Sequence, residues 1–413
     1  MKNTFLRTCI VLWGGLASVL GMDAAPTVLW GVAPDYAGQT LRLTTLHDGL
    51  SEQPDPIATD TVAPDGRFAF RFDLDRTCRV AVDLGYYRGC IYLEPGANEQ
   101  AQFPDYQPLT EAQKFNPYFR PKAVILSIVN PAENDLNVRI EAFDELCDSI
   151  WSELLFEPDI TPTLLERSME LIESRFPCKE QDFFFRYKRY NYAMLVNLYR
   201  KASPALAVEN YFRHDSIDYA NPAYWEAFDL VFELFDRVEA LEDNRPLYEL
   251  VQINRVIRRK LPVEWLDSVA TPQLRPTAQH IARQLTAGRV GSRIACGWIG
   301  LQGDSIPAAD PYGRPTYLLF ANRRIIESQS DIAYVQGLAR KWERKCRFVV
   351  VFANEDSVPQ MAPSDDIDYL CTQHNPNILS DLGVRNLPCY FLLDGEGRIE
   401  QSPAPDPEHY LPE

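Results

Sequence analysis

The sequence predicts a multidomain α+β protein with an N-terminal antiparallel β-sandwich, a central α-helical domain and a C-terminal α/β domain. At 413 residues the chain is too long for one hydrophobic core. Short strand patterns separated by turn residues fill residues 26–105, and helical periodicity fills residues 106–290. Strand and helix patterns then alternate over residues 291–405, which is typical of a parallel sheet with a helical crossover.

The N-terminus has the features of a secretory signal peptide, which we assign to residues 1–21. Lys2 and Arg7 make its start positive, and Cys9–Leu20 is an apolar run too short to span a bilayer. No other stretch approaches the roughly twenty apolar residues of a transmembrane helix. We therefore expect an exported chain, periplasmic or envelope-associated, with no transmembrane segment in its mature form.

Charge and cysteine content narrow the class of protein further. The formal net charge is −17, whereas a nucleic-acid surface carries a basic stripe, so we expect no nucleic-acid partner. Of the nine cysteines, Cys9 lies in the predicted signal peptide, and the other eight are widely spaced with no CxxC pair. An even number permits disulfides in an exported chain, but we expect mostly buried free thiols.

Residues 26–105 show the alternation of half-buried strands. Asp65-Gly66 marks a turn, and after it Phe68, Phe70 and Phe72 share one face, which we interpret as core. Several short strands with turns between them predict a small antiparallel sandwich. The expected strands are Thr27–Val32, Gln39–Thr44, Arg67–Phe72, Arg79–Asp83 and Cys90–Leu93.

Residues 106–290 predict a bundle of about six helices. The segment Gln181–Lys201 is rich in Phe and Tyr, and we interpret these rings as packing rather than as a binding face. The other expected helices are Glu141–Phe156, Leu164–Phe176, Trp225–Val238 and Pro246–Leu261.

The last region begins with a strand, a helix and a second strand, at Thr316–Ala321, Ser330–Arg344 and Arg347–Ala353. This order predicts a βαβ unit with a parallel pair. The stretch Asp381–Ile399 then adds a helix end at Gly383, a strand that Pro388 precedes, and a tight turn at Asp394-Gly395. This is the order of a thioredoxin fold.

Two resemblances follow from these motifs. Asp65-Gly-Arg-Phe-Ala-Phe70 and Ile91-Tyr-Leu-Glu-Pro-Gly96 resemble a small β-sandwich domain of uncharacterised function that precedes thioredoxin-like domains in Gram-negative envelope proteins. Roughly the last quarter of the chain resembles the TlpA-like envelope thioredoxins, through Tyr390-Phe-Leu-Leu-Asp-Gly-Glu-Gly-Arg-Ile399. The second resemblance implies a cis peptide bond before Pro388 and a binding role for Leu387 and Pro388.

The same resemblance shows what this chain lacks. In the family a CxxC motif opens the helix after the first core strand, where the helix N-terminus activates the first thiol. Here Ile325 and Ser328 replace the two cysteines, and no cysteine lies nearby. Without a thiolate, dithiol exchange by that route cannot occur.

Cys389 is the residue that could restore a redox function. It follows Pro388, so the resemblance places it near the vacant dithiol position, where it could form a mixed disulfide or pair with Cys371. The alternative interpretation is a small apolar residue in a core strand, and we expect a thiol of ordinary reactivity.

The C-terminus departs from the family as well. Residues 406–413 are assigned to a tail, because the proline-rich segment before them disfavours the final helix of the family. One face of the sheet would then be uncovered, so we expect the helical domain or another chain to cover it. Residues 365–368 are expected to form a solvated, acidic loop.

No other motif indicates chemistry. The five histidines lack metal-ligand spacing, and there is no phosphate-binding loop, so we expect no metal and no cofactor. The sequence predicts a non-catalytic, thioredoxin-like envelope protein that binds a protein or peptide partner, for example by β-augmentation. The alternatives are an atypical thiol-disulfide oxidoreductase using Cys389 and a structural role in which the three domains pack into one unit.

Overall fold

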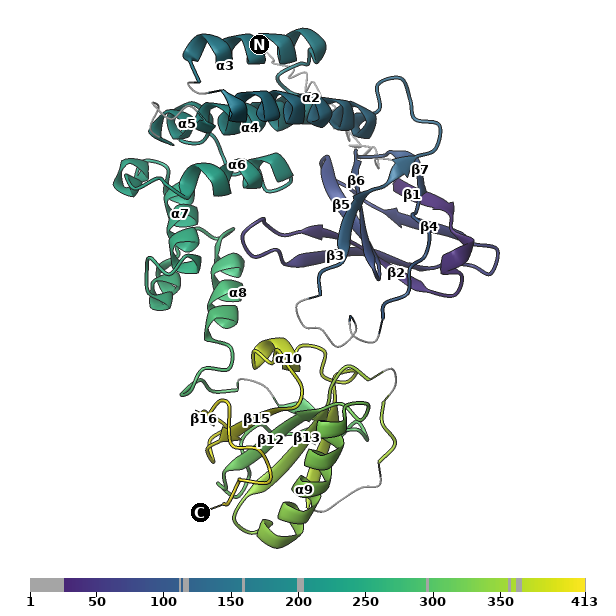
Figure 1. Ribbon diagram of the computed structural model, residues 1–413, viewed down its shortest axis with the longest axis vertical. Coiled ribbons are helices and arrows are strands. Elements are labelled where there is room, and N and C mark those ends of the chain that lie inside the picture. Colours follow the sequence, from purple (N-terminus) through teal and green to yellow (C-terminus); the bar gives the residue numbers. More distant parts are fainter. Residues whose placement is uncertain are drawn as a thin grey trace, which may run out of the picture.

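The computed structural model describes residues 26–110, 113, 119–157, 160–198, 204–294, 297–355, 358–361 and 366–412. The predicted signal peptide, residues 1–21, lies outside this part of the chain. Figure 1 shows three regions, a sandwich, a helical region and a separate sheet domain below them. In the described part of the chain, no helix combines the length and hydropathy that a membrane span needs.

Two sheets form the N-terminal sandwich. The first has the order β4-β1-β7-β9 and the second the order β3-β2-β5-β6-β8. The expected Phe stripe is buried between them, and Phe68 stacks on Phe103 with ring centroids 4.3 Å apart. The strands are β1 (Thr27–Val32), β2 (Thr40–Leu46), β3 (Pro54–Thr61), β4 (Arg67–Phe72), β5 (Cys78–Leu84), β6 (Tyr87–Leu93), β7 (Asn98–Gln102), β8 (Lys122–Ile125) and β9 (Ser127–Ile128).

The sandwich differs from the prediction in two ways. It is not wholly antiparallel, because β1 pairs with β7 and β6 pairs with β8 in parallel. It also extends beyond residue 105, since β8 and β9 each add a strand to one of the sheets. The helical region accordingly begins at Leu136 and not at residue 106.

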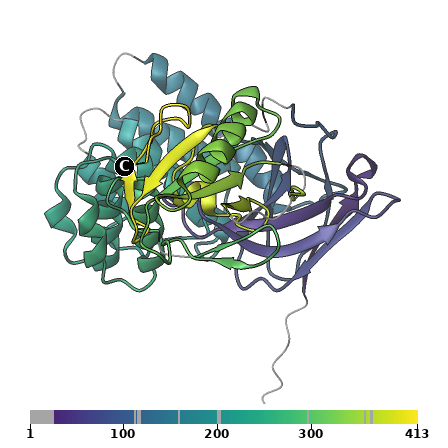
Figure 2. The same cartoon turned by 90° about the horizontal axis from the view of Figure 1, so that it is seen from below.

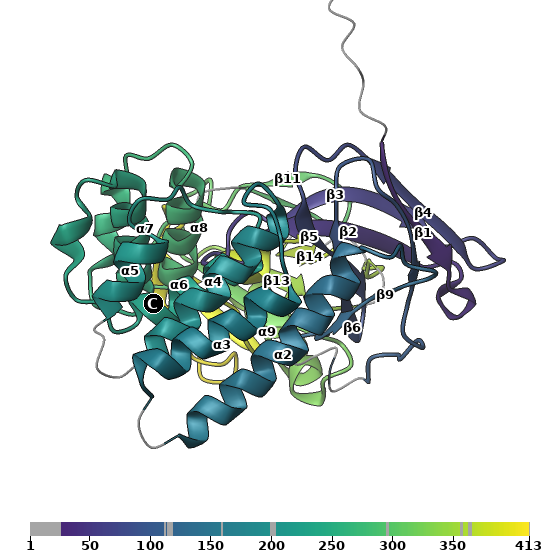
Figure 3. The same ribbon diagram turned by 90° about the horizontal axis from the view of Figure 1, so that it is seen from above.

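Seven α-helices, α2 to α8, form the central region in the described residues. Side-chain caps begin several of them; Asp135 accepts hydrogen bonds from two backbone amides at the start of α2, and Asn221 caps α6. Figure 3 shows α2, α3 and α4 side by side. The helices are α2 (Leu136–Phe156), α3 (Pro162–Arg175), α4 (Phe183–Leu198), α5 (Pro204–Tyr211), α6 (Pro222–Phe232), α7 (Arg245–Ile257) and α8 (Arg275–Thr286).

The aromatic segment in α4 packs the bundle, as expected. Phe183, Phe184, Tyr187 and Tyr190 are all buried. Phe184 and Tyr187 meet Phe143 of α2 edge to face, an arrangement that aromatic rings favour. These rings are therefore core and not an exposed binding face.

The sandwich and the helical region share direct polar contacts. The Asn137 side chain of α2 accepts a 2.7 Å hydrogen bond from the Tyr92 amide and donates a 2.9 Å bond to the Tyr92 carbonyl. The buried Asp48 carboxylate accepts a 2.7 Å bond from the Thr277 hydroxyl of α8. The two regions consequently form a common interface.

The C-terminal sheet has the order β14-β13-β12-β15-β16, with β12, β13 and β14 parallel and β15 and β16 antiparallel to their neighbours. This confirms the predicted βαβ unit. Helix α9 (Ile326–Trp342) covers one face and α10 (Ile378–Asp381) the other, with the β10–β11 hairpin. The strands are β10 (Trp298–Ile299), β11 (Ser305–Ile306), β12 (Thr316–Ala321), β13 (Arg347–Phe352), β14 (Ile367–Cys371), β15 (Cys389–Leu393) and β16 (Ile399–Gln401).

The expectation that the helical domain or another chain covers the open sheet face is wrong. The C-terminal segment covers it beside α9, and residues 406–412 are part of this domain instead of a tail. Tyr410 is buried and stacks on Tyr317 with centroids 4.5 Å apart, and the Tyr317 hydroxyl donates a 2.7 Å bond to the Pro405 carbonyl. Figure 2 shows this segment on the α9 side of the sheet.

Two local expectations also change. The acidic segment 365–368 is not simply a loop, because Ile367 begins β14 and Asp368 pairs with Arg347 Nε at 2.7 Å. The turn after β15 is longer than a two-residue Asp-Gly turn. The Asp394 carboxylate accepts from the Arg398 amide at 2.8 Å, and Gly397 has the positive φ, 77°.

Candidate functional site

The candidate site lies where the carboxyl ends of β12 and β13 meet the start of α9 and the chain entering β15. Ligands commonly bind at this edge of an open α/β sheet. Asn322, fully buried, connects the strands here. Its amide nitrogen donates to the carbonyls of Ala353 and Asn354 at 2.7 and 3.1 Å, and its oxygen accepts from the Arg324 amide at 2.9 Å.

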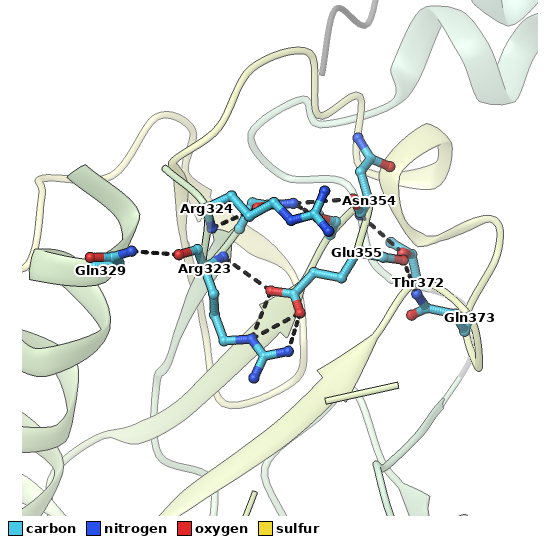
Figure 4. A network of polar contacts seen from close by, with 9 residues as sticks. Arg323, Arg324, Gln329, Asn354, Glu355, Thr372 and Gln373 are labelled. Atoms are coloured by element: carbon cyan, nitrogen blue, oxygen red, sulfur yellow. Dashed lines mark hydrogen bonds and ion pairs between the residues drawn. The ribbon is translucent and has the colours of Figure 1, made fainter. Parts of the chain in front are cut away.

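An ion pair closes this end of the sheet (Figure 4). The Arg323 guanidinium contacts both oxygens of the Glu355 carboxylate, with Nε 3.0 and 2.9 Å from them, and the Arg323 amide donates to the same carboxylate at 3.0 Å. This carboxylate raises the pKa of Arg323. Gln329 of α9 donates to the Arg323 carbonyl at 2.6 Å. The loop is thus held to both β13 and α9.

Sequence reasoning missed this ion pair. Arg323 and Glu355 are 32 residues apart, and each follows a different strand. The available signal was that both strands are parallel neighbours, so that residues just after them must meet at one edge. Around the pair, the Gln373 side chain donates to the Glu355 carbonyl, and the Asn354 amide donates to the Thr372 hydroxyl at 3.2 Å.

The positions predicted to replace a dithiol lie at the start of α9. Ile325 is the N-cap residue and makes no side-chain capping hydrogen bond, while Ser328 is fully buried one turn later. The Ser328 hydroxyl has no hydrogen-bond partner among the described residues. Between them Ile326 is 76% exposed. The start of α9 therefore exposes one large apolar side chain, Ile326, and carries no thiol at either predicted position.

The chain entering β15 supplies the second side of the site. The Leu387–Pro388 bond is cis, as the resemblance implied. Leu387 is half-buried and packs on the α10 face of the sheet. The backbone groups of Arg385, Asn386 and Leu387 make no hydrogen bond with any described residue. Three consecutive peptide groups are thus available to an extended partner.

Cys389 points away from α9. Side chains alternate along a strand, and the next residue, Tyr390, lies on the α9 face, where its hydroxyl donates to Asp331 at 2.8 Å. Cys389 instead packs with the cluster on the opposite face. Burial raises the pKa of its thiol, which lowers the thiolate fraction at neutral pH.

Pairing of Cys389 with Cys371 is excluded by the sheet. Both cysteines are free, and Cys371 is buried on the α9 face, opposite to Cys389. Their strands, β14 and β15, are separated by β13 and β12. Three strand spacings are roughly 14 Å, twice the Cα separation that a disulfide allows.

Among the described residues, no three His, Cys, Asp or Glu side chains lie close enough together to hold a metal ion. His374, which lies three residues after Cys371, is held by its Nδ1 at 2.9 Å from the Gly300 carbonyl. That contact explains the histidine as part of the loop structure.

Strand order, the βαβ unit and the position of the proline-led strand define the C-terminal region as a thioredoxin-like domain. Similar solved structures include the exposed lipoprotein thioredoxin of Streptococcus pneumoniae, 16% identical, covering 26% of this chain and 85% of that one with a TM-score of 0.22. Another is the thioredoxin domain of a thiol-disulfide oxidoreductase from Bacteroides vulgatus, 16% identical, covering 29% of this chain and 88% of that one with a TM-score of 0.22.

A third similar structure, a conserved protein of unknown function from Bacteroides fragilis, is 14% identical and covers 28% of this chain and 93% of that one, with a TM-score of 0.22. No known protein family and no curated protein matches the sequence. At these identities and scores the likenesses carry no argument about activity, and they concern only about a quarter of the chain.

Proposed function

We propose that this protein is an exported, envelope-associated binding protein whose thioredoxin-like domain holds an extended peptide segment of a protein partner without thiol exchange. The observation that carries the proposal is the run of unpaired backbone groups at Arg385–Leu387, at the same end of β12 as the start of α9 with its exposed Ile326. An extended peptide would pair with this backbone, and its apolar side chains would contact Ile326 and Leu387.

The rest of the sheet supports this placement, because the chain itself pairs with both outer strands. Ser292 accepts a 2.9 Å bond from the Ile399 amide along β16, and the Leu301 amide donates a 3.0 Å bond to Tyr369 along β14. A peptide is therefore directed to the end of the sheet and not to its edges.

Peptide selection against the purified protein, followed by titration of the selected peptide, tests the proposal. Leu387→Glu should weaken binding at least tenfold, since it introduces a charge at the contact, and Asn386→Pro should weaken it by removing one amide donor. Leu411→Glu is the control, because it places the same charge in this domain at a leucine outside the site, which is 73% exposed. Equal binding by the Leu387 and Leu411 variants would disprove the site.

An insulin-reduction assay distinguishes the proposed binding function from the alternative function, an oxidoreductase that uses Cys389. The raised pKa and the orientation of Cys389 argue for no turnover in the wild-type protein and no change in Cys389→Ser. Turnover that disappears in Cys389→Ser would establish the alternative. Export is tested separately, by cell fractionation and by N-terminal sequencing for cleavage near residue 21.

A further inference from the structure

A cleft of about 400 Å³ lies between the sandwich and the helical region. It is far from the end of the sheet described above, and it opens where the β2–β3 hairpin approaches α8 (Figure 1). Ligand sites occur preferentially at domain interfaces and in cavities of this size. Both regions contribute to its walls, with Thr45–His47 and residues 73–76 from the sandwich and Tyr219, Ala220, Gln273 and Pro276 from the helices.

Part of the cleft lining is apolar. Leu46, Ile57 and Leu74 come from the sandwich, and Ala220 and Pro276 come from the helical side. The contact between the two regions next to the cleft is rigid, since a Cβ atom on Gly49 would lie 2.3 Å from the Trp225 side chain and Asp48 binds Thr277. The cleft is therefore formed by fixed elements.

A histidine with an uncommitted nitrogen lies in the wall. His47 Nδ1 is 3.2 Å from the Asp55 carboxylate, which can only accept a hydrogen bond, so Nδ1 carries the proton. In the neutral ring Nε2 is then an acceptor, and it is buried without a partner among the described residues. Because this nitrogen is buried, recognition of a bound molecule is left to the exposed groups around the cleft.

The turn between β4 and β5 brings further uncommitted charges to the cleft. Asp73, Asp75 and Arg76 line it, and none of them makes an ion pair or side-chain hydrogen bond with a described residue. The Tyr219 hydroxyl and the Gln273 amide also lack such partners. With Asp55, three carboxylates and one guanidinium line the cleft, in a chain whose net charge is −17. Acceptors and negative charge predominate.

We propose that this cleft binds a small organic cation, with an ammonium or guanidinium group on an apolar body. The cationic group would donate to the exposed carboxylates of Asp73 and Asp75, and the apolar body would lie on Leu46 and Leu74. Agmatine has this composition, with a basic group at each end of an apolar chain, and serves as the probe.

Isothermal titration of the purified three-domain chain with agmatine tests the site, with 1,6-hexanediol as the uncharged control of similar length. Asp73→Asn/Asp75→Asn should weaken agmatine binding about three- to tenfold, the effect of two exposed charge pairs. The control double variant is Glu94→Gln/Asp105→Asn, which removes two exposed carboxylates of the sandwich outside the cleft. Gln273→Trp, at an exposed position on the rim, should block binding while retaining the far-ultraviolet spectrum of the wild type.

The proposal is supported if agmatine binds, hexanediol does not, and only the two cleft variants lose affinity. It is overturned if agmatine shows no binding up to about 10 mM, or if the Asp73/Asp75 and control variants bind equally. Neither result depends on the peptide site in the thioredoxin-like domain, so the two proposals fail separately.

Discussion

The end of the C-terminal sheet and the cleft beside the sandwich treat charged side chains in opposite ways. At the sheet end Arg323 and Glu355 are paired with each other and with the backbone, and Ile326 beside them exposes an apolar side chain. In the cleft Asp73, Asp75 and Arg76 make no ion pair or side-chain hydrogen bond with another residue that the structure describes. Paired charges hold a loop in place, whereas unpaired charges around a cavity are available to a ligand. The resemblance to thioredoxins points only to the end of the sheet. The distribution of paired and unpaired charges points to the cleft as well.

The largest expected effect comes from restoring thiols to the sheet end. Ile325→Cys/Ser328→Cys places two thiols one turn apart at the start of α9, where the helix N-terminus lowers a thiol pKa. We expect the double variant to form a disulfide and to reduce insulin, whereas the wild type does not. Ile325→Cys alone should fail, because it lacks the resolving thiol. An inactive double variant with a correct fold would show that the Arg323–Glu355 loop blocks the chemistry.

The next effect concerns the rigidity of the cleft. The buried Asp48 carboxylate accepts from the Leu50 and Ser51 amides, the Ser51 hydroxyl and the Thr277 hydroxyl. Asp48→Ala should lower the free energy of unfolding by about 3 kcal/mol, because several buried donors lose their acceptor. Thr277→Val removes only the contact to α8 and should cost about 1 kcal/mol. Urea unfolding measures both, and equal losses would mean that Asp48 acts solely across the interface.

A carboxylate inside the helical region, Asp144, gives a pH dependence. Asp144 accepts hydrogen bonds of 2.9 and 3.0 Å from the Tyr187 hydroxyl, and burial raises its pKa to about 6. Since an unfolded Asp titrates near 3.9, the native state binds more protons between these values, and stability falls as pH rises through the window of about 4 to 6.

Asp144→Asn should remove this dependence. The variant should be more stable than the wild type by about 1–2 kcal/mol at pH 7.5, a value reduced from the full shift because Asp144 is only half-buried, and similar to it near pH 4. Glu153→Gln, which removes an exposed carboxylate of the same helix that does not contribute to the Asp144 shift, is the control and should leave the pH profile unchanged. Thermal melts across this pH range would contradict the assignment if both variants followed the wild type.

The smallest effects compare a paired carboxylate at the sheet end with an unpaired carboxylate in the cleft. Glu355→Ala breaks a paired carboxylate whose side chain is 8% exposed and should cost about 1 kcal/mol or somewhat more. Asp73→Ala removes an exposed, unpaired one and should change stability by less than about 0.5 kcal/mol. Chemical denaturation measures the free energy of unfolding of both variants. Comparable losses would show that the paired and the unpaired carboxylate contribute equally to stability.

Much of the C-terminal domain was predictable, because its signals are local. The apolar runs at Thr316–Ala321 and Arg347–Phe352 specify buried strands, and Gly383 and Pro388 mark a helix end and a strand start.

In the N-terminal sandwich, the edge strand β3 was missed because Pro54 and Pro56 disfavour a strand. Its position at a sheet edge explains why they are tolerated.

The missed features of the site share one physical cause, which is distance along the chain. The Arg323–Glu355 pair joins the ends of two strands, and the cleft brings residues 73–76 against Gln273 and Pro276. No local sequence pattern predicts these contacts between residues that are far apart in the chain. The sheet edges and the final cover by Tyr410 also depend on segments that have no strong strand or helix signal of their own.

By itself the sequence determined the order of regions, the βαβ unit and the absence of a dithiol at Ile325 and Ser328, because residue identity and periodicity settle these points locally. Only the tertiary structure decided that Cys389 faces away from α9, that the chain's own C-terminus covers the sheet, and that unpaired charges surround a cleft between two domains. These outcomes depend on which distant surfaces bury one another, and burial is a property of the whole fold.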